Sequence, residues 1–449
     1  MGSILAPVIV RVLLLAGAAL AAVFAVRRRR AARDAAAALV APGAEPEERV
    51  TADAARGLVE AVLGRRPERR PLTIDFAPAT ATSWELLIDG PAFFPRMLAD
   101  IEAATSDVHI IIFGFKAGEI GTRFRDLLIR KVREGVPARL IVEAAYSQPG
   151  LGSRALYREL REGGVQVVAN QGGFLDLDGL LGERKIDWRF DDFGHFDHRK
   201  IVVVDGRVGF VGGPGIEDHY NDERFHDIMV RLEGPIVSQL QAVFLLSWHF
   251  QGGPLPDTAE GLDRYFPTQP DAAGVAMEIL ANNPGEKHLP IAPAFQSAID
   301  GATRRLYVIN PYLADRAILQ GIVEAAKRGA DVRVIVPADP KSFPAKAAVR
   351  AFFPALHEAG VDIREHPSMA HAKVVLADDT VFAGTANLDG LSLRRNWELQ
   401  LRIEDQRVAD HVAKELFDRD LLVATPARIP TGVRERAVNR AVSALSPLL

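Results

Sequence analysis

The first 30 residues combine a long apolar run with a cluster of positive charge. Residues 4–26 form a run of 23 positions whose only charged member is Arg11, and Arg27–Arg30 follow directly. A helix of that length spans about 34 Å, enough for a hydrocarbon core of about 30 Å. Because the charges follow the apolar run, the pattern predicts a single-pass anchor in the cell membrane with a cytoplasmic body. A soluble Ala-rich helix or a cleaved leader peptide is the alternative.

Beyond this segment, apolar positions alternate between helical and strand periodicity, and the alternation occurs twice. Segment 133–142 (REGVPARLIV) is similar to segment 327–336 (KRGADVRVIV). Each follows a helical pattern and runs into a β-branched strand, and an earlier strand pattern lies upstream at 108–115 or 306–312. Strands alternating with helices are typical of α/β domains. The sequence therefore predicts two tandem α/β domains related by pseudo-twofold symmetry.

The same patterns divide the chain into six segments. A stretch rich in proline separates the two repeats, and proline interrupts both helices and strands. We expect a transmembrane anchor with its Arg cluster over 1–30, a spacer over 31–84, a first half over 85–252, a linker over 253–274, a second half over 275–425 and a C-terminal helical tail over 426–449.

The charge balance separates the N-terminal segment from the body. The net charge is −4, from 54 basic and 58 acidic residues, but residues 1–33 hold six arginines and no acid. The remainder therefore has 48 bases against 58 acids, a net charge of −10. Affinity for nucleic acid comes largely from neutralising phosphates, so we expect no specific nucleic-acid partner. The absence of cysteine excludes disulfides, thiolate metal sites and a cysteine nucleophile.

One motif occurs once in each repeat. His198-Arg-Lys200 leads to Asp205, and His371-Ala-Lys373 leads to Asp378, so both copies read H-x-K-x4-D. Each copy continues through a short loop and a strand that ends in glycine, at Gly212 or Gly384. The composition predicts roughly 0.02 copies by chance, so two copies at matching places indicate function.

The spacing suits transfer at a phosphodiester. On a strand, residues i and i+2 face the same side, so each His projects beside its Lys. The pseudo-twofold would then place two imidazoles and two ammonium groups around one phosphorus: one His attacks, the other protonates the leaving oxygen, and the lysines stabilise the charge. This apparatus requires no metal and no cofactor. A zinc site among His195, His198 and His219 is the alternative use of these histidines.

With this duplicated motif, residues 85–425 resemble the phospholipase D superfamily, and most closely its bacterial cardiolipin synthase-like members. The stretches that carry the resemblance are 198–206, 227–235, 310–312 and 384–392, with Asn396 and Glu398. It implies that His198 is the nucleophile and His371 the general acid and base. The remaining implied roles are phosphate binding by Lys200, Lys373 and Asn387, and orientation of each His by the carboxylate of the opposite half, Asp227 or Glu398.

Four further residues have expected supporting roles, and one more is assigned to the phosphate. We expect Asp205 and Asp378 to order loops, and Gly212 and Gly384 to support the motif strands. Thr385 is expected to donate its hydroxyl near the phosphate.

Three departures from the family pattern stand out. The first half has glycine at position 215, where the family has asparagine, so it lacks one phosphate donor. The second motif is one residue shorter between Asp378 and Gly384, which predicts a tighter turn. Phe113 and Phe115 stand where these synthases tend to have tyrosine.

The function predicted from these features is a phosphatidyltransferase of cardiolipin synthase type, which acts on phosphatidylglycerol or a similar phospholipid at the membrane through a phosphohistidine. Alternatives are a phospholipase D hydrolase that releases phosphatidic acid, a nucleic-acid phosphodiesterase and a non-catalytic membrane scaffold. An apolar insertion near residues 171–196 favours a lipid substrate. A helical insertion with its own core is the alternative interpretation of that segment.

Overall fold

The structure is a computed structural model, and all the residues that it describes belong to the unit Arg49–Leu449. It describes residues 50–52, 57, 59, 74–147, 151–170, 196–222, 224–256, 259–269, 272–283, 288–340 and 343–444. The predicted anchor over 1–30, nearly all of the apolar insertion and His195 lie outside the described residues. Among the described residues, no helix has both the length and the apolar character needed to cross a bilayer.

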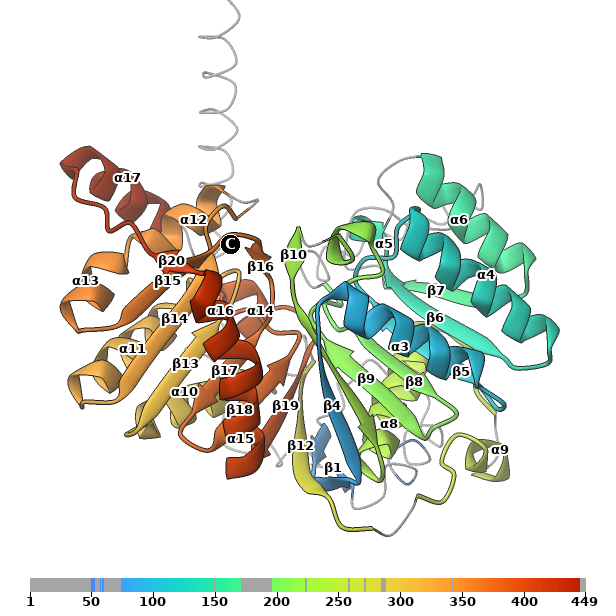
Figure 1. The fold of residues 1–449 in the computed structure, drawn as a ribbon. Coiled ribbons are helices and arrows are strands. Elements are labelled where there is room, and N and C mark those ends of the chain that lie inside the picture. The colour runs from blue at the N-terminus through green and yellow to red at the C-terminus, as the bar shows by residue number, and fades with distance from the viewer. Residues whose placement is uncertain are drawn as a thin grey trace, which may run out of the picture. The chain divides into compact units, whose positions relative to one another are not determined.

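Two mixed β-sheets repeat one strand order (Figure 1). The first sheet runs β4 (Ser83–Ile88), β11 (Ile228–Glu233), β9 (Val208–Gly212), β8 (Ile201–Val204), β5 (Val108–Ile112), β6 (Ala138–Glu143) and β7 (Gln166–Asn170). The second runs β12 (Val275–Asn282), β19 (Glu398–Glu404), β18 (Thr380–Gly384), β17 (Val374–Ala377), β13 (Arg305–Ile309), β14 (Asp331–Pro337) and β15 (Asp362–His366), with β3 (Ala79–Ala81) and β20 (Thr425–Pro426) added at its two edges. The predicted pair of α/β domains is thus confirmed.

Two short strand pairs complete the sheets. One joins β1 (Val50–Ala52) to β2 (Ile74–Phe76), and the other joins β10 (Phe225–His226) to β16 (Met369–Ala370). The second pair is parallel and connects the two halves of the body.

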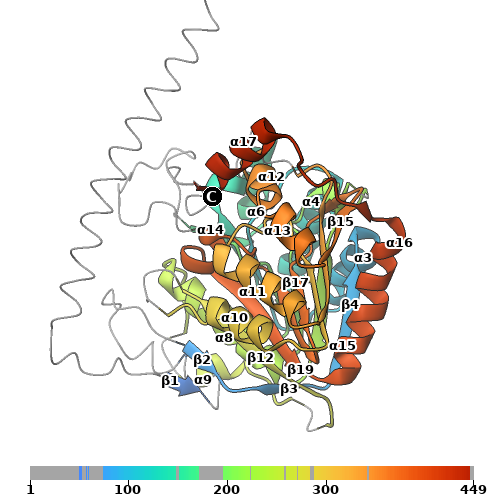
Figure 2. The same ribbon diagram turned by 90° about the vertical axis from the view of Figure 1, so that its left-hand side faces the viewer.

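Helices cover both sheets, most of them on the outer faces, whereas those over 236–250 and 406–417 pack with the inward residues of the sheets. In the first half they are α3 (Gly90–Glu102), α4 (Glu119–Arg133), α5 (Ala144–Ser147), α6 (Leu151–Glu162), the 3₁₀ turn η2 (Asp218–Tyr220), α8 (Ile236–Phe250) and α9 (Ala259–Asp263). In the second half they are α10 (Ile291–Gly301), α11 (Arg316–Lys327), α12 (Phe343–Arg350), α13 (Phe353–Glu358), α14 (Gly390–Arg394), α15 (Gln406–Val412), the π-helical η3 (Ala413–Phe417), α16 (Asp418–Val423) and α17 (Val433–Ala444). Figure 2 shows α10, α11 and α13 lying over the second sheet.

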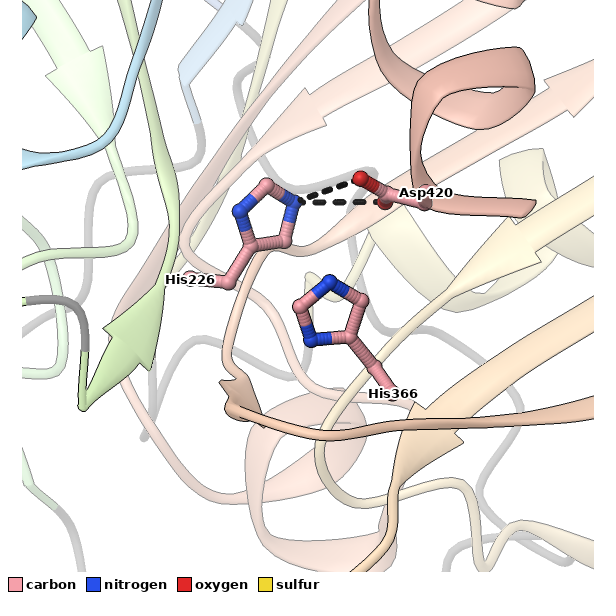
Figure 3. A group of neighbouring side chains, drawn as sticks. All are labelled: His226, His366 and Asp420. Atoms are coloured by element: carbon pink, nitrogen blue, oxygen red, sulfur yellow. Dashed lines mark hydrogen bonds and ion pairs between the residues drawn. The ribbon is translucent and has the colours of Figure 1, made fainter. Parts of the chain in front are cut away.

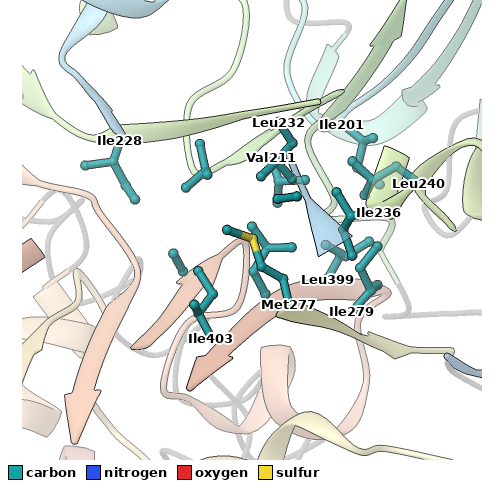
Figure 4. Packing of buried hydrophobic residues seen from close by; sticks show 14 of the residues in the cluster. Ile201, Val211, Ile228, Leu232, Ile236, Leu240, Met277, Ile279, Leu399 and Ile403 are labelled. Atoms are coloured by element: carbon teal, nitrogen blue, oxygen red, sulfur yellow. The ribbon is translucent and has the colours of Figure 1, made fainter. Parts of the chain in front are cut away.

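Successive side chains on a strand point to opposite faces of the sheet, and this alternation divides the buried apolar residues among three cores. In β5, Ile110 and Ile112 pack against the helices of the first half, whereas Ile111 faces the other way. In β13, Val308 packs under the helices of the second half and Ile309 faces inward. The inward residues of both sheets form one shared cluster (Figure 4). Because this core is common to both halves, it holds the two histidine motifs against each other.

The segment boundaries differ from the expected ones in two places. The expected spacer contributes β3, which pairs antiparallel with β12 of the second half, and its final residues begin β4. The expected linker contains the short helix α9, and β12 begins at Val275. Apolar alternation at 79–81 is too short to be recognised in the sequence, which is why the strand was assigned to a spacer.

Candidate active site

The two His–Lys pairs lie immediately before strands rather than within them. β8 begins at Ile201 and β17 at Val374, one residue after each lysine. The prediction that the pairs lie on strands was therefore wrong, although the backbone next to both pairs is bridged across the halves. Asp197 bridges to Trp397, and the His371 backbone N–H donates to the carbonyl of His226 at 2.7 Å.

The first site is built around His198. Its Nδ1 lies 3.0 Å from Oε1 and 3.1 Å from Oε2 of Glu398, a residue of the other half. The edge of its ring meets Phe113 at a centroid distance of 4.7 Å, and the ammonium of Lys200 lies 5.0 Å from the centre of the same phenyl ring. Both His198 and Lys200 are buried. Glu398 thereby fixes the ring and directs Nε2 away from itself.

The second site is built around His371 and mirrors the first. Its Nδ1 lies 2.7 Å from Oδ2 of Asp227, again a residue of the opposite half. Nζ of Lys373 is within 3.1 Å of both ring nitrogens. Tyr220 and Phe225 contact the ring from the first half, with centroid distances of 5.6 and 5.4 Å. Nothing in the sequence pattern marked these two aromatic residues, because they follow an irregular Gly-rich turn.

Burial governs the charge states of the four motif residues. Burial lowers the pKa of His198, and burial together with the adjacent Lys373 lowers the pKa of His371 to about 3. Burial also lowers the pKa of Lys200 to about 7 and that of Lys373 to about 8. Both imidazoles are therefore neutral near pH 7, the form that can act as a nucleophile or accept a proton.

The two orienting carboxylates remain ionised. Burial alone would raise the pKa of each, but His198 and Lys200 lower the pKa of Glu398, and Lys373 and His371 lower that of Asp227. Each carboxylate can therefore accept Nδ1–H from the histidine of the opposite half.

The loop residues repeat one arrangement. The Asp205 carboxylate accepts the backbone N–H groups of Thr105, Ser106 and Asp107, and the Asp378 carboxylate accepts those of Thr303, Arg304 and Arg305. Both aspartates have positive φ, at 54° and 52°. These contacts tie the turns after β8 and β17 to the backbone that leads into β5 and β13, and the second turn is one residue shorter.

The glycines that end β9 and β18 leave room for a neighbouring strand. A Cβ at Gly212 would collide with the carbonyl of Ile228, and one at Gly384 with the carbonyl of Leu399. Only glycine fits at either position without moving the adjacent backbone. Both positions therefore require glycine so that the neighbouring strand can approach.

Thr385 differs from its predicted role. Its hydroxyl donates to Oε2 of Glu398 at 2.5 Å and accepts the Leu399 N–H at 2.9 Å. The hydroxyl is therefore occupied by the carboxylate that orients His198, and it is not available to a phosphate. Asn387 is buried, and its amide oxygen makes no hydrogen bond within the described part of the chain. A buried amide group of this kind suits contact with a bound polar ligand.

Lys116 lies outside the motifs and contacts both an acidic and an aromatic side chain. Its ammonium lies 2.8 Å from Oε2 of Glu217 and 3.8 Å from the centre of the Tyr146 ring. Tyr146 in turn stacks on Phe113 at 4.3 Å, so an aromatic wall leads from Lys116 to His198.

Comparisons with known proteins agree with this geometry. Residues 97–248 and 295–421 match the family model described as cardiolipin synthase, PLD-like domain. The chain is 34% identical over 378 residues to cardiolipin synthase A of Pseudomonas entomophila, which covers 81% of this chain and 74% of that protein. It is 30% identical over 392 residues to cardiolipin synthase 1 of Bacillus cereus, with 83% and 73% covered.

A solved structure shares the fold. The phosphatidylserine synthase of Haemophilus influenzae superposes with a TM-score of 0.62 at 14% identity, over 88% of this chain and all of that one. The two-domain α/β arrangement is therefore a known architecture.

Proposed function

The chain belongs to the cardiolipin synthase, PLD-like domain family, and on that premise we propose that it is a phosphatidyltransferase that converts phosphatidylglycerol to cardiolipin. The observation that carries the proposal is the pair of buried histidines, each with Nδ1 against a carboxylate of the opposite half and each beside a lysine. This arrangement leaves Nε2 of one histidine to attack phosphorus and that of the other to manage protons.

In the first step, Nε2 of His198 attacks the phosphorus of a phosphatidylglycerol. The new P–N bond forms as the P–O bond to glycerol breaks, and a proton held by His371 passes to the departing oxygen. Lys200 and Lys373 stabilise the charge on the equatorial oxygens. The anionic phosphate also draws Lys373 toward itself, which relieves the positive charge against His371 and raises its pKa enough to hold the proton.

In the second step, a hydroxyl group of another phosphatidylglycerol attacks the phosphohistidine. His371 takes the hydroxyl proton, the P–O bond forms and the P–N bond to His198 breaks, so the enzyme returns to its starting state. If water replaces the lipid hydroxyl, the product is phosphatidic acid, and the same residues carry out hydrolysis.

The test is incubation of the purified full-length chain with radiolabelled phosphatidylglycerol in mixed micelles. Formation of cardiolipin with an equal amount of glycerol supports the proposal. Phosphatidic acid as the only labelled lipid product would establish a hydrolase instead. The His198→Ala protein, purified in parallel, controls for contaminating lipid enzymes.

We propose further that residues 4–26 anchor the enzyme in the cell membrane with its catalytic body on the cytoplasmic side. The support is the apolar length and the following Arg27–Arg30 cluster. Retention of the full chain in carbonate-washed membranes, with release when residues 1–30 are deleted, would support the anchor. Release of the full chain by carbonate would contradict it.

A further inference from the structure

A second buried cluster of titratable side chains lies next to the catalytic histidines. It comprises His226 on β10, His366 at the end of β15, Asp420 on α16 and Asp89, which precedes α3 (Figure 3 shows the first three). His226, His366 and Asp420 are each no more than 6% exposed. Nothing in the proposed reaction uses these residues.

His226 contacts one carboxylate from each half. Its Nδ1 lies 3.0 Å from Oδ1 of Asp89 in the first half, and its Nε2 lies 3.1 Å from Oδ1 of Asp420 in the second. A neutral imidazole has only one N–H, so donation to both carboxylates requires the imidazolium form. These contacts raise the pKa of His226 to about 10, against the opposing effect of burial.

The cluster also contacts the backbone that holds the second catalytic site. The carbonyl of His226 accepts the N–H groups of His371 at 2.7 Å and Ala372 at 3.2 Å. Asp89 accepts the N–H of Asp227 at 3.1 Å and donates its own N–H to the carbonyl of Asp227 at 2.9 Å. Thus both members of the Asp227–His371 pair are attached to residues of the cluster.

Asp89 adopts an unusual backbone conformation to make these contacts. Its φ of 64° and ψ of 159° lie in a region that is essentially restricted to glycine. Such strain persists only where the surroundings hold it. Here one backbone bond to Asp227, the bond from the Asp227 N–H to the Asp89 carboxylate and the contact with His226 do so. The conformation marks this residue as part of a positioning device.

We propose that His226 is a positioning residue, which as an imidazolium joins Asp89 to Asp420 across the two halves and thereby sets the distance between Asp227 and His371. The inference rests on the proposed phosphoryl-transfer chemistry of His371. A zinc ion held by His226, His366 and Asp420 is the competing use of the cluster. The structure favours the imidazolium because Nδ1 and Nε2 of His226 both already face carboxylates, whereas His366 only stacks on its ring, with centroids 4.8 Å apart.

Three variants separate the possibilities. His226→Gln removes the cation, and we expect kcat to fall about 100-fold, since a shift of about 1 Å at a reacting group has that effect. His226→Arg supplies a cation with N–H groups on two sides, and we expect it to restore kcat to within about threefold of the native value. His366→Gln is the matched control, because it removes the stacked ring and leaves both carboxylate contacts of His226; kcat should remain within about threefold.

The readout is hydrolysis of bis(p-nitrophenyl) phosphate, alongside cardiolipin formation and thermal unfolding of each variant. Cleavage of the model diester depends on the two histidines but not on a lipid. A native chain that cleaves the diester but makes no cardiolipin would therefore refute the proposed function, while the effect of the His226 variants on diester cleavage could still be measured. Failure of His226→Arg to restore kcat in a stably folded protein would overturn the proposal. So would one tightly bound zinc per native chain by mass spectrometry together with loss of activity in a stably folded His366→Gln, since the two results together would assign the cluster to a metal.

Discussion

The two histidine sites share one plan but support their carboxylates differently. In the site of His198, the orienting residue is Glu398, and Thr385 donates a hydrogen bond to it. In the site of His371, the orienting residue is the shorter Asp227, and the residue equivalent to Thr385 is Gly213. A Cβ at Gly213 would collide with the Asp227 carboxylate.

This difference shows that the length of the carboxylate side chain and the size of the residue beside it compensate each other. Where the carboxylate is longer, a hydroxyl group helps to fix it; where it is shorter, the neighbouring residue is glycine, and the Ile228 N–H holds the carboxylate at 2.8 Å. The glycine at position 213 is therefore required by the position of the Asp227 carboxylate. Both solutions place a carboxylate within 3.0 Å of a histidine from the opposite half.

The largest effect should come from removing either histidine. We expect His198→Ala and His371→Ala each to lower kcat for cardiolipin formation by at least about 10³-fold, because each removes a reacting group. Acid-quenched reactions with ³²P-labelled lipid distinguish the two roles. If His198 is the nucleophile, His371→Ala retains a phosphohistidine and His198→Ala has none; the opposite pattern would exchange the two roles.

Removing the carboxylate charge should have the next largest effect. Glu398→Gln and Asp227→Asn preserve shape but no longer select the Nδ1–H tautomer, so we expect kcat to fall about 10²- to 10⁴-fold with little change in KM. Thr385→Val should cost about tenfold, through Glu398 alone, and Thr385→Ser should be nearly native. Equal kcat values for the valine and serine variants would show that the hydroxyl does not hold the carboxylate.

The two lysines, one in each histidine site, allow the sites to be compared through the pH dependence of the rate. Lys200 and Lys373 lose their charge as pH rises through about 7 and 8, so kcat/KM of the native enzyme should decline on the alkaline side, where a neutral amine no longer stabilises the phosphorane. Lys200→Arg stays protonated throughout this range. Its overall rate should be several-fold lower, but its alkaline decline should begin about one pH unit higher; an unchanged profile would exclude Lys200 as the titrating group.

The smallest predicted effect is on stability, and it concerns the residues at the start of two equivalent strands, β5 and β13. β5 is preceded by the buried Asp107, whose equivalent in β13 is Arg305. Burial raises the pKa of Asp107 to about 6 in the folded chain. Ionisation therefore costs stability as pH rises from about 4 to 6, and the cost is complete above that range.

Asp107→Asn removes this cost. We expect the variant to unfold at a temperature about 1–3 °C higher than the native protein at pH 8 and at the same temperature at pH 4. Circular dichroism melts at both pH values test it, with Ser106→Ala as a neighbouring control. A gain of equal size at both pH values would mean that the charge of Asp107 is not its source.

Much of this protein was predictable from local sequence patterns. Alternation of apolar residues at period two determines which face of β5 or β13 meets helices, and the repeated H-x-K-x4-D spacing identifies both His–Lys pairs. The loop role of Asp205 and Asp378 was also predictable, because a carboxylate at a strand end accepts nearby backbone N–H groups. These features depend on neighbours in sequence or on repetition.

Only the tertiary structure decided which groups act on one another across the halves. His198 and Glu398 are 200 positions apart and His371 and Asp227 are 144 apart, and the resemblance to a family suggested these pairs where spacing alone could not. Three further contacts had no signal in the sequence. These are the hydrogen bond from Thr385 to Glu398, the close approach of Gly213 to Asp227, and the position of His226 between Asp89 and Asp420. Contacts of this kind depend on how two separately patterned sheets pack, and packing is set by the whole shared core rather than by any one segment.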